Sequence, residues 1–255
     1  MKKEKAVSYP HSVVAVIPAA GSGVRMGLDT PKQFMDLLGK PLLALTLLPF
    51  QHCRAVDAVI LVAPAGELDF CRENIVRKHA LDKVKVVVSG GARRQDSVRL
   101  GLEATEGAFD RVLIHDGVRP LLCPDFLTCM IKEGENHRAL VTGYPAKDTI
   151  KEATKDRDVI RTLDRRRLWM IQTPQLFRFD DLMEAHHKAL RENWEEATDD
   201  ALLLEQMGIP VKIIEGPEEN IKVTTPHDLE TVRYLMRKEA SATPLKGVDK
   251  SPSEL

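Results

Sequence analysis

The sequence predicts an α/β fold, built as a doubly wound and mostly parallel sheet. Two observations lead to this prediction. Apolar runs of strand length alternate with helical patterns along most of the chain, and the runs are rich in Val and Ile without a polar residue at every second position. Such nearly continuous runs are typical of strands buried on both faces. The chain has 255 residues, of which 43% are hydrophobic and 29% charged, so it is long enough and apolar enough for a substantial core.

The first half of the chain supplies the repeating units. We expect strands at 13–18, 58–63, 83–89 and 111–116. Between them, helical patterns cover 41–53, 67–81 and 94–105. Because the order is strand, helix, strand, the connections are expected to be right-handed crossovers between parallel strands.

The pattern changes after a further helix expected at 124–137. Residues 139–177 contain no amphipathic helix, and β-branched and charged residues alternate around a polar "KDRD" turn. We interpret 141–163 as a strand leading into a protruding β-hairpin. An isolated two-stranded ribbon buries little surface, so this arm is expected to pack on a second subunit and to make a homodimer. A solvated loop excursion is the alternative.

The last third returns to α/β units. Helices are expected at 180–193 and at 199–208, the second ending at Gly208. A strand follows at 211–216, and a helix at 225–240 begins with Thr225 as its cap and Asp228 as the acidic member of a capping box. We therefore expect an N-terminal extension (1–12), one domain (13–240, with its arm at about 141–163) and a disordered tail (241–255).

Charge and cysteine content limit the possible partners. With 37 basic and 38 acidic residues the net charge is −1, so no global charge attracts nucleic acid or a membrane surface. No apolar run approaches the roughly 18 residues of a membrane span, and the basic N-terminus lacks the apolar core of a signal peptide. The four cysteines form no CxxC pair, and we expect free thiols and a cytoplasmic protein.

The segment "VIPAAGSGVRMGLDTPKQF" (17–35) is the strongest candidate for a ligand site. Its glycines do not have the G-x-G-x-x-G spacing of dinucleotide-binding loops, and no GK[ST] ends it as in a P-loop. Small residues from Ala19 to Gly23 allow backbone amides to surround an anion, and Arg25 and Lys32 add positive charge beside them. A polyphosphate is therefore the expected ligand. A purely structural tight turn is the alternative.

Several motifs, in this order, resemble those of one enzyme family. "PAAGSGVRM" and "PKQF" are followed by "GGARRQDSV" (90–98), "HDGVRP" (115–120), "KDT" (147–149), "LDRRRLW" (163–169), "QTPQLF" (172–177), "TDDA" (198–201) and "NIKVTTPHDL" (220–229). The chain thus resembles the sugar nucleotidyltransferases and, more narrowly, the 2-C-methyl-D-erythritol 4-phosphate cytidylyltransferases, from residue 13 to about 237.

The resemblance implies a fold and a reaction. The fold would be a Rossmann-like domain whose hairpin arm builds a homodimer. The reaction would join CTP to methylerythritol phosphate, a sugar-alcohol phosphate, and release pyrophosphate for non-mevalonate isoprenoid synthesis. Mg²⁺ would be held mainly by the CTP phosphates and water, without a protein cage.

The resemblance also implies roles for individual residues. Arg25 and Lys32 would stabilise the transition state, while Arg165 and Lys222 would position the acceptor phosphate. From the arm, Arg165 and Thr149 would reach into the neighbouring subunit's site. The other implied ligand-binding residues are Ala19, Ala20, Gly21 and Gly23 at the phosphates, Gly90, Gly91 and Ser97 at the cytosine, and Arg119 and Thr198 near the acceptor. Asp116 would contact either the acceptor hydroxyls or the metal shell.

The chain departs from the family pattern at three places. Ala92 stands where an acidic residue is frequent, Asp200 where Glu is usual, and Gly117-Val118 within "HDGVRP" replace commoner residues. We expect a structural role for Asp200. The attacking phosphate oxygen is already ionised near neutral pH, so no general base is needed, and we expect His115 to serve packing.

Two other functions stay open at this point. A ribitol 5-phosphate cytidylyltransferase would share the glycine loop and "NIKVTTP", although "TLDRRRLWMIQTPQ" (162–175) favours the methylerythritol family. A non-catalytic CTP sensor is possible because a fold does not determine a function. Pyrophosphate release distinguishes an enzyme from a sensor.

Overall fold

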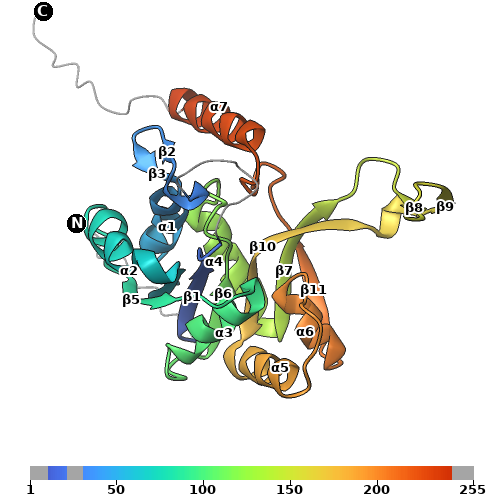
Figure 1. Ribbon diagram of the computed structural model, residues 1–255, viewed down its shortest axis with the longest axis horizontal. Coiled ribbons are helices and arrows are strands. Elements are labelled where there is room, and N and C mark those ends of the chain that lie inside the picture. Colours follow the sequence, from blue (N-terminus) through green and yellow to red (C-terminus); the bar gives the residue numbers. More distant parts are fainter. Residues whose placement is uncertain (1–10, 22–30, 243–255) are drawn as a thin grey trace, which may run out of the picture.

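A seven-stranded sheet forms the centre of the computed structural model, which describes residues 11–21 and 31–242. The strand order is β11-β7-β10-β6-β1-β4-β5 (Figure 1). Gly23 and Arg25 lie outside the described residues, as do most of the expected N-terminal extension and tail. The strands of this sheet are β1 (Val13–Pro18), β4 (Ala58–Ala63), β5 (Val84–Ser89), β6 (Arg111–Ile114), β7 (Ala139–Pro145), β10 (Trp169–Arg178) and β11 (Val211–Glu215).

The sheet is mostly parallel, as predicted. β1 pairs in parallel with β4 and β6, β4 with β5, and β7 with β11. The exception is β10, which runs antiparallel between β6 and β7. The sequence analysis did not identify β10 as a strand, because its polar residues and Pro174 interrupt the apolar pattern that marked the others.

Helices cover both faces of the sheet, so the prediction of a doubly wound fold is confirmed. Val13, Ala15 and Ile17 of β1 pack in one buried cluster, and Val14 and Val16 pack in another on the opposite face. The first face carries α1 (Leu42–His52), α2 (Leu68–Phe70), the π-helical segment η4 (Cys71–Arg77) and α4 (Pro124–Glu133). The second carries α3 (Arg94–Glu103), α5 (Phe179–Arg191) and α6 (Asp200–Gln206).

Most expected elements agree with the structure to within a few residues. The helix expected at 67–81 is instead three short pieces, because η3 (Ala65–Glu67) and α2 lead into the π-helical η4. The remaining short elements are η2 (Lys32–Phe34), β2 (Asp36–Leu37), β3 (Lys40–Pro41), η5 (Gly134–Asn136) and η6 (Arg165–Arg167).

The protruding hairpin exists, and it extends from β7 and β10 away from the body of the molecule (Figure 1). Its strands are β8 (Lys151–Ala153) and β9 (Val159–Thr162). Val159 and Ile160 are 61% and 58% exposed within this one chain. Exposed β-branched residues on an isolated ribbon are unusual and are typical of a surface that a partner covers.

The last helix, α7 (Pro226–Ala242), lies at the top of the molecule in the view of Figure 1, apart from the arm at the right. Its predicted capping box is confirmed, since Thr225 Oγ1 accepts the Asp228 N–H at 3.2 Å and Asp228 Oδ2 accepts the Thr225 N–H at 2.8 Å. Leu229 and Val232 share a buried cluster with Val118 and Val223. In the described part of the chain, no helix combines the length and apolarity needed to cross a membrane.

Candidate functional site

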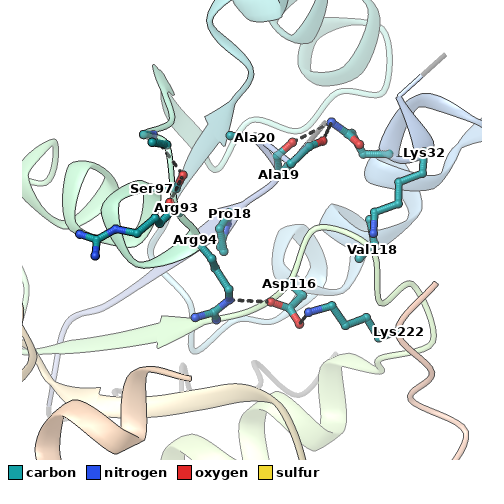
Figure 2. Close-up of a pocket in the computed structure, with 14 residues that line it drawn as sticks. Pro18, Ala19, Ala20, Lys32, Arg93, Arg94, Ser97, Asp116, Val118 and Lys222 are labelled. Carbon is teal, nitrogen blue, oxygen red and sulfur yellow. Dashed lines mark hydrogen bonds and ion pairs between the residues drawn. The ribbon is translucent and has the colours of Figure 1, made fainter. Parts of the chain in front are cut away.

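A cavity of about 430 Å³ opens at the carboxyl end of the central strands. Open α/β sheets bind ligands at this edge. We call it the first cavity, and Figure 2 shows the residues that line it. Eight of the residues expected from the sequence lie here together: Ala19, Ala20, Gly21, Lys32, Gly91, Ser97, Asp116 and Lys222.

A second cavity, of about 250 Å³, adjoins the first. Arg94, Asp116 and Lys222 line both. The expected residues Arg119 and Thr198 line the second cavity. So do Gln172, Thr173 and Gln175 of β10, where the pairing with β7 shifts between Gln172 and Gln175. This β-bulge explains how residues that would alternate between faces in a regular strand can all reach one cavity.

Gln33, which was not among the expected site residues, holds the backbone at the start of the glycine loop. Gln33 is buried, and its Nε2 donates to the carbonyl oxygens of Ala19 at 2.9 Å and Gly21 at 3.1 Å. The backbone N–H of Ala19 also donates to the Val62 carbonyl at 2.7 Å. Because these carbonyls are engaged, the backbone of Ala19 to Gly21 is held in place at the mouth of the first cavity. Its position directly after Lys32 in the sequence could have marked Gln33 as a site residue.

Gly90 is required by close packing between two loops. A Cβ at this position would lie 2.2 Å from the Ala20 Cβ and 2.8 Å from the Ser97 Oγ. The Ser97 hydroxyl accepts the Gly91 N–H and donates to the Arg93 carbonyl, both at 3.1 Å. Ser97 therefore fixes the conformation of the Gly90-Gly91 loop, and its own hydrogen-bond donor is already used.

Asp116 is the electrostatic centre of the site. Its carboxylate is buried and contacts three cations: Arg94 Nε at 3.1 Å, Lys222 Nζ at 3.0 Å and Arg119 Nε at 3.3 Å. Figure 2 shows Arg94 and Lys222 reaching it from opposite sides. Burial alone would raise the pKa of Asp116, but the charges of Arg94, Lys222 and Arg119 outweigh burial and hold that pKa well below its usual range.

Arg94 also pairs with a second carboxylate, Asp200, so the three cations face two carboxylates and one positive charge is left in excess. At this junction of the two cavities the protein therefore favours anionic ligands. Phosphate oxygens match this charge, and so would a transition state in which negative charge builds up on phosphate. The described residues thus supply an anion-binding centre shared by two adjoining cavities.

His115 has a structural role, as expected. The ring is fully buried, with Nε2 3.1 Å from the Arg119 carbonyl and Nδ1 3.1 Å from the Thr173 hydroxyl. A carbonyl only accepts, so Nε2 carries the proton and Nδ1 accepts from Thr173. Burial lowers the pKa of His115 to about 4, and the ring is therefore neutral at physiological pH. Thr173 Oγ1 also accepts the Asp116 N–H at 3.0 Å, which ties this network to the centre of the site.

Arg94 was not among the expected site residues, yet it links Asp116 to a second buried carboxylate, Asp200. Its Nε donates to Asp116, and its Nη1 donates to Asp200 at 2.7 Å. Asp200 is buried and accepts from His186 through its other oxygen at 3.1 Å. The signal in the sequence was a cation in the first turn of a helix, where the helix dipole disfavours it unless an anion lies nearby.

Two expected residues lie away from both cavities in this chain. Thr149 and Arg165 are exposed on the arm, and Arg165 Nη1 donates to the Lys147 carbonyl at 2.6 Å. Within one subunit the structure does not bring them to Asp116. Gly23 and Arg25 lie outside the described residues.

No trio of His, Cys, Asp or Glu that suits a metal ion occurs within 11–21 and 31–242. Asp116, the acid that lines both cavities, already neutralises Arg94, Arg119 and Lys222. These residues fit a metal that arrives with its nucleotide better than one held in a protein cage.

Comparison with known proteins identifies a family over almost the whole chain. Residues 13–238 match the model of the 2-C-methyl-D-erythritol 4-phosphate cytidylyltransferase family. The enzyme of that name from Syntrophus aciditrophicus is 42% identical over 227 residues, which cover 89% of this chain and 97% of the relative. Its namesake from Geobacter metallireducens is 43% identical over 221 residues, covering 86% and 94%.

Solved structures agree with the fold. The 4-diphosphocytidyl-2C-methyl-D-erythritol synthase of Anaerococcus prevotii superposes with a TM-score of 0.77 at 29% identity, covering 89% of this chain and 98% of that one. The 2-C-methyl-D-erythritol 4-phosphate cytidylyltransferase of Thermus thermophilus gives 0.73 at 32% identity, covering 89% and 99%.

Proposed function

The chain belongs to the 2-C-methyl-D-erythritol 4-phosphate cytidylyltransferase family, and from this premise we propose that its two cavities are the CTP site and the acceptor site. The protein is a nucleotidyltransferase of non-mevalonate isoprenoid biosynthesis. It transfers the cytidylyl group of CTP to 2-C-methyl-D-erythritol 4-phosphate, giving 4-diphosphocytidyl-2-C-methyl-D-erythritol and pyrophosphate. The observation that carries the assignment of the cavities is the cluster of Arg94, Arg119 and Lys222 around Asp116, at the point where the cavities meet.

In the first cavity, we assign the triphosphate to the glycine loop. Backbone amides of Ala19 to Gly23 and the side chains of Arg25 and Lys32 supply the positive field. The cytosine lies against Gly90 and Gly91, whose backbone Ser97 holds in shape. Absence of a side chain at Gly90 lets this loop approach Ala20 closely, so that base and phosphates are held by two loops in contact.

In the second cavity, the acceptor lies beside Arg119, Thr198 and Asp116. Its phosphate oxygen, already ionised, attacks the α-phosphorus of CTP. The new P–O bond forms as the bond from the α-phosphorus to the bridging oxygen breaks, and pyrophosphate leaves with that electron pair. Lys222 lies at the junction and neutralises phosphate charge on both substrates. The protein's contribution is alignment and charge neutralisation, without proton transfer by a side chain.

We assign Mg²⁺ as the cofactor, held by the CTP phosphates and water. When bound, it neutralises phosphate charge and favours departure of pyrophosphate. The proposal rests on the engagement of Asp116 with three cations, which leaves it little capacity as a metal ligand.

A homodimer completes the proposed site. The arm carries Thr149 and Arg165 away from their own cavities, and it exposes Val159 and Ile160. Packing the arm on a second subunit would cover these residues and bring Arg165 and Thr149 to the partner's acceptor. The free thiols of Cys53, Cys71, Cys123 and Cys129 suit the reducing cytoplasm, where we place the enzyme.

Pyrophosphate release with CTP and Mg²⁺ tests this proposal, with 2-C-methyl-D-erythritol 4-phosphate and ribitol 5-phosphate as alternative acceptors. We expect release with the first acceptor alone. Turnover with ribitol 5-phosphate alone would overturn the acceptor but keep the two cavities. CTP binding without turnover of either acceptor would replace the enzyme with a nucleotide sensor.

A further inference from the structure

We propose that His186 and Asp200 are positioning residues that hold the Arg94 guanidinium at the junction of the two cavities. This inference rests on the proposed function of those cavities. Neither residue lines the first or the second cavity. Their effect on the reaction would therefore pass through Arg94.

Hydrogen bonds form a continuous chain from His186 on α5 to Asp116 at the site. His186 lies on α5, Asp200 opens α6, and Arg94 opens α3. His186 Nε2 is 3.1 Å from Asp200 Oδ1, Asp200 Oδ2 accepts from Arg94 Nη1 at 2.7 Å, and Arg94 Nε donates to Asp116 at 3.1 Å. Each oxygen of Asp200 thus has its own donor. His186 of α5 fixes the plane of the carboxylate, and the carboxylate in turn orients the Arg94 guanidinium.

Burial makes this arrangement rigid. The side chains of His186 and Asp200 are 0% and 1% exposed, and Arg94 is 24% exposed towards the cavities. A buried carboxylate with a single partner could rotate about its Cβ–Cγ bond, whereas one held at both oxygens cannot do so without losing a hydrogen bond. Burial raises the pKa of Asp200, but Arg94 and the His186 hydrogen bond outweigh burial and keep that pKa low, so the carboxylate stays charged.

Arg94 keeps N–H groups that the protein does not use. A guanidinium has five N–H donors, and only one on Nε and one on Nη1 are engaged. Its Nη2 is buried without a hydrogen-bond partner among the described residues, while the side chain as a whole is 24% exposed. An anionic oxygen in the cavities can meet this exposed part of the guanidinium. Since Arg94 lines both cavities, the group it meets there is a phosphate of the bound substrates. A guanidinium displaced by a fraction of an ångström would meet that phosphate less well as charge develops.

The experiment compares His186→Leu with His186→Gln, with His187→Leu as the control. Leu removes the donor to Asp200, whereas the Gln Nε2 can restore it from nearly the same position. His187 is the adjacent residue of α5, but it is 41% exposed and makes only a 3.7 Å contact to Glu103. We expect His186→Leu to lower kcat/KM for the acceptor about tenfold, with a smaller change in KM for CTP. His186→Gln and His187→Leu should remain within about twofold of wild type.

A double-mutant cycle separates positioning from general destabilisation. In an Arg94→Gln background, His186→Leu should cause little further loss of kcat/KM, because its effect passes through Arg94. Equal losses in both backgrounds would overturn the proposal, as would a His186→Leu enzyme with a lowered Tm but unchanged kinetic constants. If His186→Leu does not fold, His186→Asn replaces it. The shorter Asn amide leaves Asp200 Oδ1 without a donor. Activity of His186→Asn equal to that of His186→Gln would overturn the proposal.

Inactivity of wild type towards both acceptors would instead refute the proposed function.

Discussion

At the scale of single residues, the site contains two adjacent buried residues, His115 and Asp116, that differ in charge state. Asp116 is buried but surrounded by cations, so it keeps its charge. His115 is fully buried, and its hydrogen-bond partners are a carbonyl and a hydroxyl, so burial outweighs the nearby Asp116 and the ring loses its charge. Both states follow from the same low-dielectric surroundings, which disfavour a charge unless an opposite charge compensates it.

His115 should make stability depend on pH. Its pKa falls from 6.5 in the unfolded chain to about 4 in the folded one, so between these values the unfolded chain binds more protons. Stability is therefore lost as the pH falls from 6.5 to 4, by roughly 3 kcal/mol for this group, and the loss levels off below pH 4. Urea unfolding of wild type and His115→Gln at several pH values measures it. The two curves should diverge through this window, and parallel curves would contradict the assignment.

Arg25 tests the proposed stabilisation of the transition state. Removing one such donor typically lowers kcat by about 10²–10³-fold. We expect Arg25→Ala to lower kcat within this range and to raise KM for CTP far less, because the interaction strengthens as charge develops. Steady-state pyrophosphate release gives both constants. An unchanged kcat would remove Arg25 from the mechanism.

At the scale of elements, the carboxyl ends of β1 and β5 act together through the contact of Gly90 with Ala20. A Cβ at residue 90 would overlap both Ala20 and Ser97, and such overpacking costs about 1–3 kcal/mol. Part of this cost would appear as displacement of the glycine loop from the nucleotide.

We therefore expect Gly90→Ala to raise KM for CTP about tenfold, measured by titrating CTP at saturating acceptor. Gly66→Ala is the matched control, because a Cβ there meets nothing within 4 Å and the backbone is not in the left-handed region. The KM for CTP should be clearly higher in Gly90→Ala than in Gly66→Ala. Equal KM values would mean that the loops can separate without effect on the nucleotide.

At the scale of the whole molecule, the arm links the chemistry to assembly. If Arg165 acts in the partner's site, a mixed dimer of Arg165→Ala and Arg25→Ala subunits has one site with both changes and one with neither. Each mixed dimer should then show about half of the wild-type rate, although each parent is impaired. Activity after subunit exchange, with the exchange verified by native mass spectrometry, measures this. Exchange without recovery would place Arg165 in its own subunit's site or outside any site.

The α/β class, the positions of most strands and helices, and the loop residues that gather at the first cavity could be predicted from the sequence alone. This was possible because burial on both faces makes parallel strands continuous in Val and Ile, and because small residues in a loop after a strand mark close approach to a ligand. The order of motifs also sufficed for the family. The capping box at Thr225 and Asp228 was predictable because it is local.

Which distant groups meet could not be predicted from the sequence and became visible in the folded structure. β10 enters the sheet antiparallel and supplies Thr173 and Gln172, yet its own sequence lacks a strand pattern because its partners, not its periodicity, stabilise it. Arg94, Asp200 and His186 form one chain of contacts although Asp200 is 106 residues from Arg94. The sequence marks Asp200 as a departure from the family pattern and Arg94 as a cation in the first turn of a helix, but it does not indicate that they meet. Their shared role arises only when three helices bring these side chains together away from water, where each buried charge needs a partner.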